Sequence, residues 1–130
     1  MNRRAMRLTA ATLLAGEAVS LVAFWIAWHR LPSLQRVIEP SGASEQFAWF
    51  LWADLCVLVP LCVVSAAWLV TRIPRVTIAC AMHLAAAVYA TVWTVAAVLH
   101  SGVSWTAATA MLGLSCVAAF AVRASRMERG

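Results

Sequence analysis

Hydrophobic and polar positions divide this chain into four long apolar runs, separated by shorter polar segments. The runs cover residues 8–28, 47–70, 76–99 and 104–122. Each run has about the 20 residues that a helix needs to cross a hydrocarbon core of roughly 30 Å. The pattern therefore predicts an all-α integral membrane protein, in which a four-helix bundle forms a single domain over residues 1–130.

The connections between these runs differ in length. Residues 71–75 and 100–103 are short turns, whereas residues 29–46 make one long connection. Within it, apolar side chains recur at rough helical spacing, at Leu31, Leu34, Val37 and Ile38. This spacing predicts a short helix that lies in the membrane interface.

Composition supports lipid as the solvent. Of the 130 residues, 64% are hydrophobic and 12% are charged, whereas a soluble domain is nearer half apolar and a quarter charged. All ten basic residues are arginines, and they flank the apolar runs as topology signals do, so no nucleic-acid partner is expected. The four cysteines fall inside apolar runs, where a thiol acts as a small apolar side chain and not as part of a disulfide framework.

The arginines also predict an orientation. Three precede the first run, two lie between the second and third, and three follow the fourth, whereas the opposite side has only Arg30 and Arg36. The positive-inside rule then places both termini in the cytoplasm, with the protein in the plasma (inner) membrane. Tryptophans gather near the predicted outer face, as an aromatic belt does; they include Trp25, Trp28 and Trp52.

Three ionisable side chains lie deep inside the predicted spans, and these are the candidates for proton or ligand binding. At 1.5 Å per residue, Glu17 lies about 14 Å, His83 about 10 Å and Asp54 about 20 Å from the cytoplasmic edge. Ionisable groups at such depth usually face the bundle interior or a water cavity and often serve function. Ser20 is three residues after Glu17 and can hydrogen-bond it.

Asp54 has no polar neighbour at helical spacing on its own run, so it needs a partner on another helix, in water or on a second subunit. Pro60 follows it in the same run. Because proline has no backbone N–H, it frees the carbonyl of Cys56 and favours a bend.

A metal site is a weak alternative, and the leading expectation is that the protein holds no metal and no cofactor. Cys80 and His83 are one turn apart on the third run, and Cys62, Cys116 and Glu17 are predicted at comparable depth. Thiolate and imidazole would suit Zn²⁺ or Cu⁺. The sequence contains no phosphate loop, nucleophile elbow or other catalytic motif, which favours a protein that is not an enzyme.

Glu17, within LLAGEAVS, is an acid in the middle of the first helix of a small four-helix protein. In this it is similar to the small multidrug resistance transporters, and that resemblance implies exchange of protons for a lipophilic cation at Glu17. Residues 53–72 also resemble the second helix of uncharacterised small bacterial membrane proteins, which implies a bacterial inner membrane and no particular activity.

Two main hypotheses about function follow. The first is a small non-enzymatic accessory or interaction subunit of a larger membrane complex, with its acids buried at helix contacts. The alternative is a proton-coupled carrier or a lipophilic-ligand-binding protein that uses Glu17 and Asp54 as titrating groups, with His83 modulating them. Four helices enclose little space, so this alternative also predicts a homo-oligomer. A third, less favoured hypothesis is a membrane-embedded enzyme that uses an acid pair.

Overall fold

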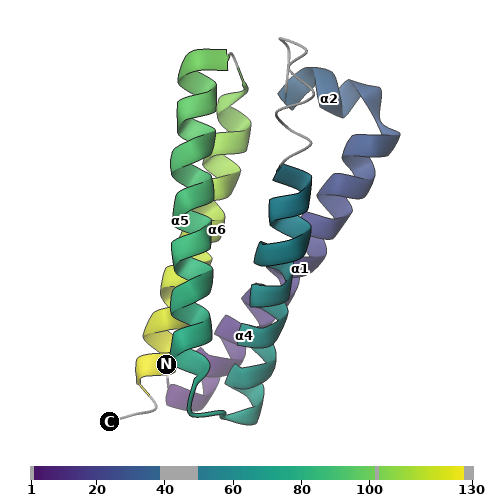
Figure 1. Cartoon of the computed structure of the whole chain (residues 1–130). Coiled ribbons are helices and arrows are strands. Elements are labelled where there is room, and N and C mark those ends of the chain that lie inside the picture. The colour runs from purple at the N-terminus through teal and green to yellow at the C-terminus, as the bar shows by residue number, and fades with distance from the viewer. Residues whose placement is uncertain (1, 39–49, 102, 128–130) are drawn as a thin grey trace.

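The computed structural model describes residues 2–38, 50–101 and 103–127. Within these ranges it confirms the all-α four-helix bundle, with four helices long and apolar enough to cross a membrane (Figure 1). The long helices are α1 (Arg3–Arg30), the span Phe50–Thr71, α5 (Val76–Ser101) and α6 (Trp105–Arg126). The span Phe50–Thr71 contains a π-helical turn, η1 (Asp54–Leu58), followed by α4 (Val59–Thr71). A short helix, α2 (Pro32–Ile38), follows α1 as the spacing of apolar residues predicted.

The bundle consists of two antiparallel helix pairs. α1 packs mainly against α4, and α5 packs mainly against α6. The first residues of α1, the turn between α4 and α5, and the last residues of α6 all lie at the same end of the bundle (Figure 1). The described ends of the chain are therefore on one side, which agrees with an even number of spans.

Capping residues set the helix ends, and this explains why the helices differ from the apolar runs. The side chain of Asn2 accepts a hydrogen bond from the backbone N–H of Ala5 at 2.7 Å, so α1 begins five residues before the apolar run. At α6, Ser104 accepts from the N–H of Thr106 at 3.2 Å. Hydropathy reports where lipid begins, whereas a cap satisfies the free N–H groups of the first turn.

At Pro60, where the sequence favoured a bend, the structure has the π-helical turn η1 just before the proline. The N–H of Val59 bonds the carbonyl of Asp54, five residues earlier. Pro60 has no N–H for the carbonyl of Cys56, and its ring would crowd that carbonyl in a regular α-helix. The wider turn accommodates both effects, and such single π-turns are frequent at functional sites.

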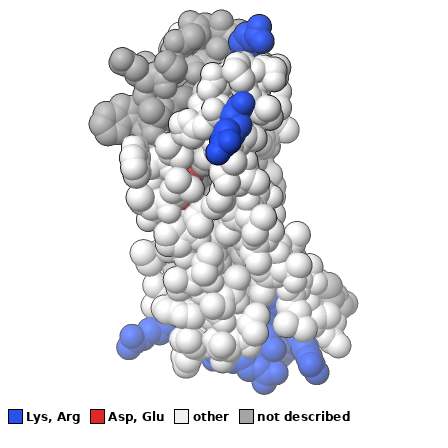
Figure 2. Space-filling model, turned by 90° about the vertical axis from the view of Figure 1, so that its right-hand side faces the viewer, with Lys and Arg blue, Asp and Glu red and all other residues white. Residues whose placement is uncertain are grey.

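The outside of the bundle is apolar between two charged ends. Large hydrophobic side chains are exposed on every long helix, among them Ile26, Val63, Val92 and Leu112. Figure 2 shows one face with arginines at the two ends and an uncharged wall between them, broken only by a small recessed acidic area. An exposed apolar girdle of this kind is what a lipid environment requires. The structure thus supports a multi-pass membrane protein.

Candidate functional site

Two buried polar clusters lie inside the bundle, and each contains one of the predicted acids. The first joins α1 to η1. The indole N–H of Trp25 donates a hydrogen bond to Oδ2 of Asp54 at 2.8 Å, and both side chains are buried. The other carboxylate oxygen of Asp54, Oδ1, is buried and has no hydrogen-bond partner among the described residues. Asp54 therefore finds its partner on another helix of the same chain.

The second cluster joins three helices, with Glu17 from α1, Cys62 from α4 and His83 from α5. Nε2 of His83 lies 3.0 Å from Oε1 of Glu17. The sulfur of Cys62 lies 3.8 Å from Nδ1 and 3.7 Å from Nε2 of the same ring. All three side chains are buried, and the exposed fraction of His83 is 0%. We call this set the Glu17–Cys62–His83 cluster.

The two clusters occupy two levels of one ladder between α1 and the antiparallel span Phe50–Thr71. On α1, Glu17, Leu21 and Trp25 follow one another at four-residue intervals. On the facing span, Leu58 is four residues from both Asp54 and Cys62. Leu21 and Leu58 share a buried apolar cluster, so an apolar layer lies between the two polar levels.

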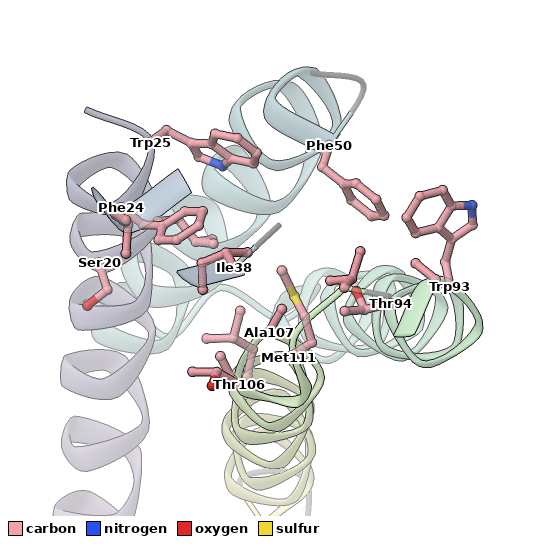
Figure 3. Close-up of a pocket in the computed structure, with 16 residues that line it drawn as sticks. Ser20, Phe24, Trp25, Ile38, Phe50, Trp93, Thr94, Thr106, Ala107 and Met111 are labelled. Atoms are coloured by element: carbon pink, nitrogen blue, oxygen red, sulfur yellow. The ribbon is translucent and has the colours of Figure 1, made fainter. Parts of the chain in front are cut away.

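An apolar cavity of about 350 Å³ lies between the two helix pairs, beside the Trp25–Asp54 cluster, which we call the upper level. Figure 3 shows its walls: Phe24 and Trp25 project from α1, Phe50 from the start of the span Phe50–Thr71, Trp93 from α5 and Met111 from α6. The rings of Phe50 and Trp93 are edge to face, with centroids 4.0 Å apart. Aromatic walls of this kind give a cavity of defined shape for an apolar ligand.

The described lining of this cavity carries hydroxyl groups but no ionisable side chain. The hydroxyls belong to Ser20, Thr94 and Thr106, and the indole of Trp25 also contributes to the wall. The hydroxyl of Thr94 already donates to the carbonyl of Ala90 at 2.7 Å. Neither Glu17 nor Asp54 lines the cavity, so the acids do not present a charge to its contents.

The structure brings together two of the three candidate residues and leaves the third apart. Glu17 meets His83, as their similar predicted depths allowed, whereas Asp54 belongs to the upper level. The hydrogen bond that the spacing allowed between Ser20 and Glu17 is not formed, because neither carboxylate oxygen of Glu17 has a hydrogen-bond partner in the described chain. Cys80 lies outside the group of possible metal ligands that includes His83, and Cys116 is exposed.

Two contributing residues were not singled out from the sequence. Trp25 was assigned to the aromatic belt, and Cys62 was noted only for its depth. The spacing carried a signal for both, since Trp25 is eight residues from Glu17 and Cys62 is eight residues from Asp54. Eight residues are close to two helical turns plus a small rotation, so each pair shares one helix face.

Comparison of the chain with protein-family models, with curated proteins and with solved structures found no match.

Proposed function

We propose that this protein binds an uncharged lipophilic molecule inside the membrane, in the cavity between the two helix pairs. The observation that carries this proposal is the cavity itself, which lies within the 300–1,000 Å³ range that is typical of small-molecule sites. Its aromatic walls favour a ligand with a flat ring or a short acyl chain. Binding of a lipophilic ligand is one part of the alternative hypothesis drawn from the sequence.

The chemistry of the lining argues for a neutral ligand. A lipophilic cation, which the resemblance to small multidrug resistance transporters implied, needs a carboxylate close by to neutralise its charge in an apolar interior. In the described lining no carboxylate faces the cavity, because Glu17 lies two helical turns below Trp25 and Asp54 lies behind the indole. The surface of the cavity is almost wholly apolar, which suits a ligand without charged groups.

Asp54 supports this role indirectly, by holding a wall of the cavity in place. The indole of Trp25 lines the cavity, and its N–H is fixed by Asp54 at 2.8 Å. A ring that is held before the ligand arrives loses less conformational freedom on binding. This gives the upper acid a positioning function without contact with the ligand.

Photolabelling tests the proposal. The purified protein in lipid nanodiscs is irradiated with trifluoromethyl phenyldiazirine, a small neutral aromatic label, and the modified residues are mapped by peptide mass spectrometry. We expect saturable labelling at cavity residues such as Phe24 and Met111. An excess of a neutral aromatic lipophile should reduce it, whereas tetraphenylphosphonium, a lipophilic cation, should not.

A pair of matched variants completes the experiment. Ala107→Phe places a ring in the cavity and should reduce labelling there to the level of the outer surface. Ala23→Phe makes the same change at an exposed position of α1 and should leave cavity labelling unchanged. Labelling that never saturates, or that survives Ala107→Phe undiminished, would show that the label only samples surrounding lipid.

We also propose that the arginine-rich end faces the cytoplasm of a bacterial inner membrane. Supporting this, seven described arginines lie in the segments at that end and two lie near the other: Arg3, Arg4, Arg7, Arg72, Arg75, Arg123 and Arg126 against Arg30 and Arg36. Cysteines introduced at Arg3 and Arg126 should resist a membrane-impermeant maleimide in intact cells and react after lysis. Reaction of both before lysis would reverse the orientation. The accessory-subunit hypothesis and the homo-oligomer stay predictions.

A further inference from the structure

We propose that the Glu17–Cys62–His83 cluster is a binding site for a divalent zinc ion, at the level where the two helix pairs meet. This site is distinct from the cavity and does not depend on the proposed lipophilic ligand. It also differs from the Cys80–His83 pair suggested by sequence spacing, because the thiol that approaches His83 comes from α4 and not from α5.

The distances within the cluster are close to those of a tetrahedral zinc centre. Zinc bonds of about 2.3 Å to sulfur and about 2.0–2.1 Å to nitrogen and oxygen give tetrahedral edges of about 3.6 Å for S···N and about 3.3 Å for N···O. The structure has 3.7 Å between Sγ of Cys62 and Nε2 of His83 and 3.0 Å between that nitrogen and Oε1 of Glu17. One ligand atom from each residue lies within 4.8 Å of the other two. Binding of one ion to all three requires the His83 ring or the Cys62 side chain to turn, because the sulfur does not lie in the direction in which Nε2 bonds.

The polar atoms of the cluster are poorly satisfied by one another. Both carboxylate oxygens of Glu17 are buried and lack a hydrogen bond of good geometry, even though Nε2 is near. The sulfur of Cys62 is almost equidistant from the two ring nitrogens, so it does not lie along the in-plane direction in which either nitrogen bonds. Buried polar groups without partners are costly in an apolar interior. A cation placed between them would satisfy all three groups at once.

Charge balance and ligand type together favour a divalent transition-metal ion such as zinc over Mg²⁺, Ca²⁺ and Cu⁺. When Zn²⁺ binds, the Cys62 thiol loses its proton to the solvent and a Zn–S bond forms, while Glu17 binds as a carboxylate and His83 as a neutral imidazole. The ion carries two positive charges and the ligands carry two negative charges, so the complex is neutral, as a lipid interior requires. Mg²⁺ and Ca²⁺ prefer all-oxygen sites, and Cu⁺ with the same ligands would leave one net negative charge.

Ligands from three helices would join the two halves of the bundle. Glu17 and Cys62 belong to the α1–α4 pair, and His83 belongs to α5 in the other pair. Three protein ligands leave a fourth position for water, which is the arrangement that zinc sites with an open position have. The sequence alone could not show this, because the three residues lie on different helices and share no motif.

The experiment measures metal binding by the purified full chain in detergent. Zinc content is determined after equilibration with Zn²⁺ and desalting, and Co²⁺ serves as a spectroscopic substitute. We expect one zinc per chain and, with Co²⁺, a thiolate-to-metal charge-transfer band that demonstrates cysteine ligation in the unmodified protein. Because this band needs no variant, it tests the proposal even where a substitution impairs folding.

Variants then identify the ligands. Cys62→Ala and Glu17→Gln should each weaken zinc binding by more than the roughly 10- to 100-fold that loss of a group outside the ligand set costs, and Cys62→Ala should abolish the charge-transfer band. Cys80→Ala, which removes another buried thiol one turn from His83, should preserve both. Size-exclusion profiles and circular dichroism confirm that each variant is folded.

Three results would overturn the proposal. They are zinc content no higher than in a folded Cys62→Ala variant, a cobalt spectrum without a thiolate band, and binding that is lost when the exposed His29 and His100 are both changed to Gln. The last result would place the metal at surface histidines. None of them bears on photolabelling of the cavity, so the two proposals fail separately.

Discussion

Replacing Trp25 by Phe should weaken the bundle by breaking the hydrogen bond that anchors Asp54. The bond is short, at 2.8 Å, and both side chains are buried. Trp25→Phe keeps most of the ring but removes the N–H. Since Oδ1 of Asp54 already lacks a partner in the described structure, the whole carboxylate would then be buried without a donor.

The expected magnitude follows from the environment. In water, a hydrogen bond to a charged group contributes about 1.5–3 kcal/mol. In membrane proteins, side-chain pairs average about 0.6 kcal/mol and reach about 1.7 kcal/mol, because helices unfolded within lipid also find partners. The short distance and complete burial of this pair place it near the upper limit. We therefore expect a coupling energy of about 1.5 kcal/mol, which is about tenfold in the folding equilibrium.

A double-mutant cycle measures this quantity. The single variants Trp25→Phe and Asp54→Leu and the double variant are unfolded by titration with sodium dodecyl sulfate in mixed micelles, followed by far-UV circular dichroism. The coupling energy is the difference between the double variant and the sum of the singles. The cycle removes the loss of ring area and any other contact of Trp25 that does not involve Asp54.

The control cycle pairs Trp28→Phe with Asp54→Leu. Trp28 is also buried on α1, but the indole that bonds Asp54 is that of Trp25, so coupling should stay within about 0.5 kcal/mol of zero. If the Trp25–Asp54 cycle gave an equally small value, the hydrogen bond would contribute nothing to stability. The account of Asp54 as the anchor of the cavity wall would then be refuted.

Two further predictions concern the packing of the helices. The hydroxyl of Thr91 on α5 donates a hydrogen bond to the carbonyl of Met111 on α6 at 3.0 Å, so Thr91→Val should lower the free energy of unfolding by about 0.6–1.7 kcal/mol in the same titration. The control Thr109→Val removes only an exposed hydrogen bond within α6 and should lower it by less than about 0.5 kcal/mol. Equal losses for the two variants would show that the bond between α5 and α6 does not stabilise the bundle. Pro60→Ala restores a backbone donor, so the π-turn should relax toward an α-helix and turn Asp54 away from Trp25. The coupling energy between Trp25 and Asp54 should then fall by more than half. An unchanged coupling energy would show that Pro60 does not set this turn.

The sequence predicted the spans and the similar heights of Glu17 and His83 well, because both depend only on counting along the chain. Long apolar runs are specific for membrane helices, and a constant rise per residue converts position into height. Glu17 and His83 were predicted about 4 Å apart in height, and the structure places them in contact.

The rotation of each helix about its axis could not be predicted, and it decides which side chains meet. In a soluble protein the apolar face identifies the interior, but here the outer face is equally apolar because it contacts lipid. Hydropathy therefore did not show that Cys62 and Trp25 face inward. The π-turn before Pro60 added a further change of phase, since a wider turn rotates every preceding side chain relative to those that follow.

The leucine layer has a consequence for how charge moves in this protein. With Leu21 and Leu58 packed between the Glu17 and Asp54 levels, no described hydrogen bond leads from one carboxylate to the other. Within the described residues, a proton on one acid therefore has no hydrogen-bonded path to the second. Proton transfer between the two acids would require Leu21 and Leu58 to separate and admit water.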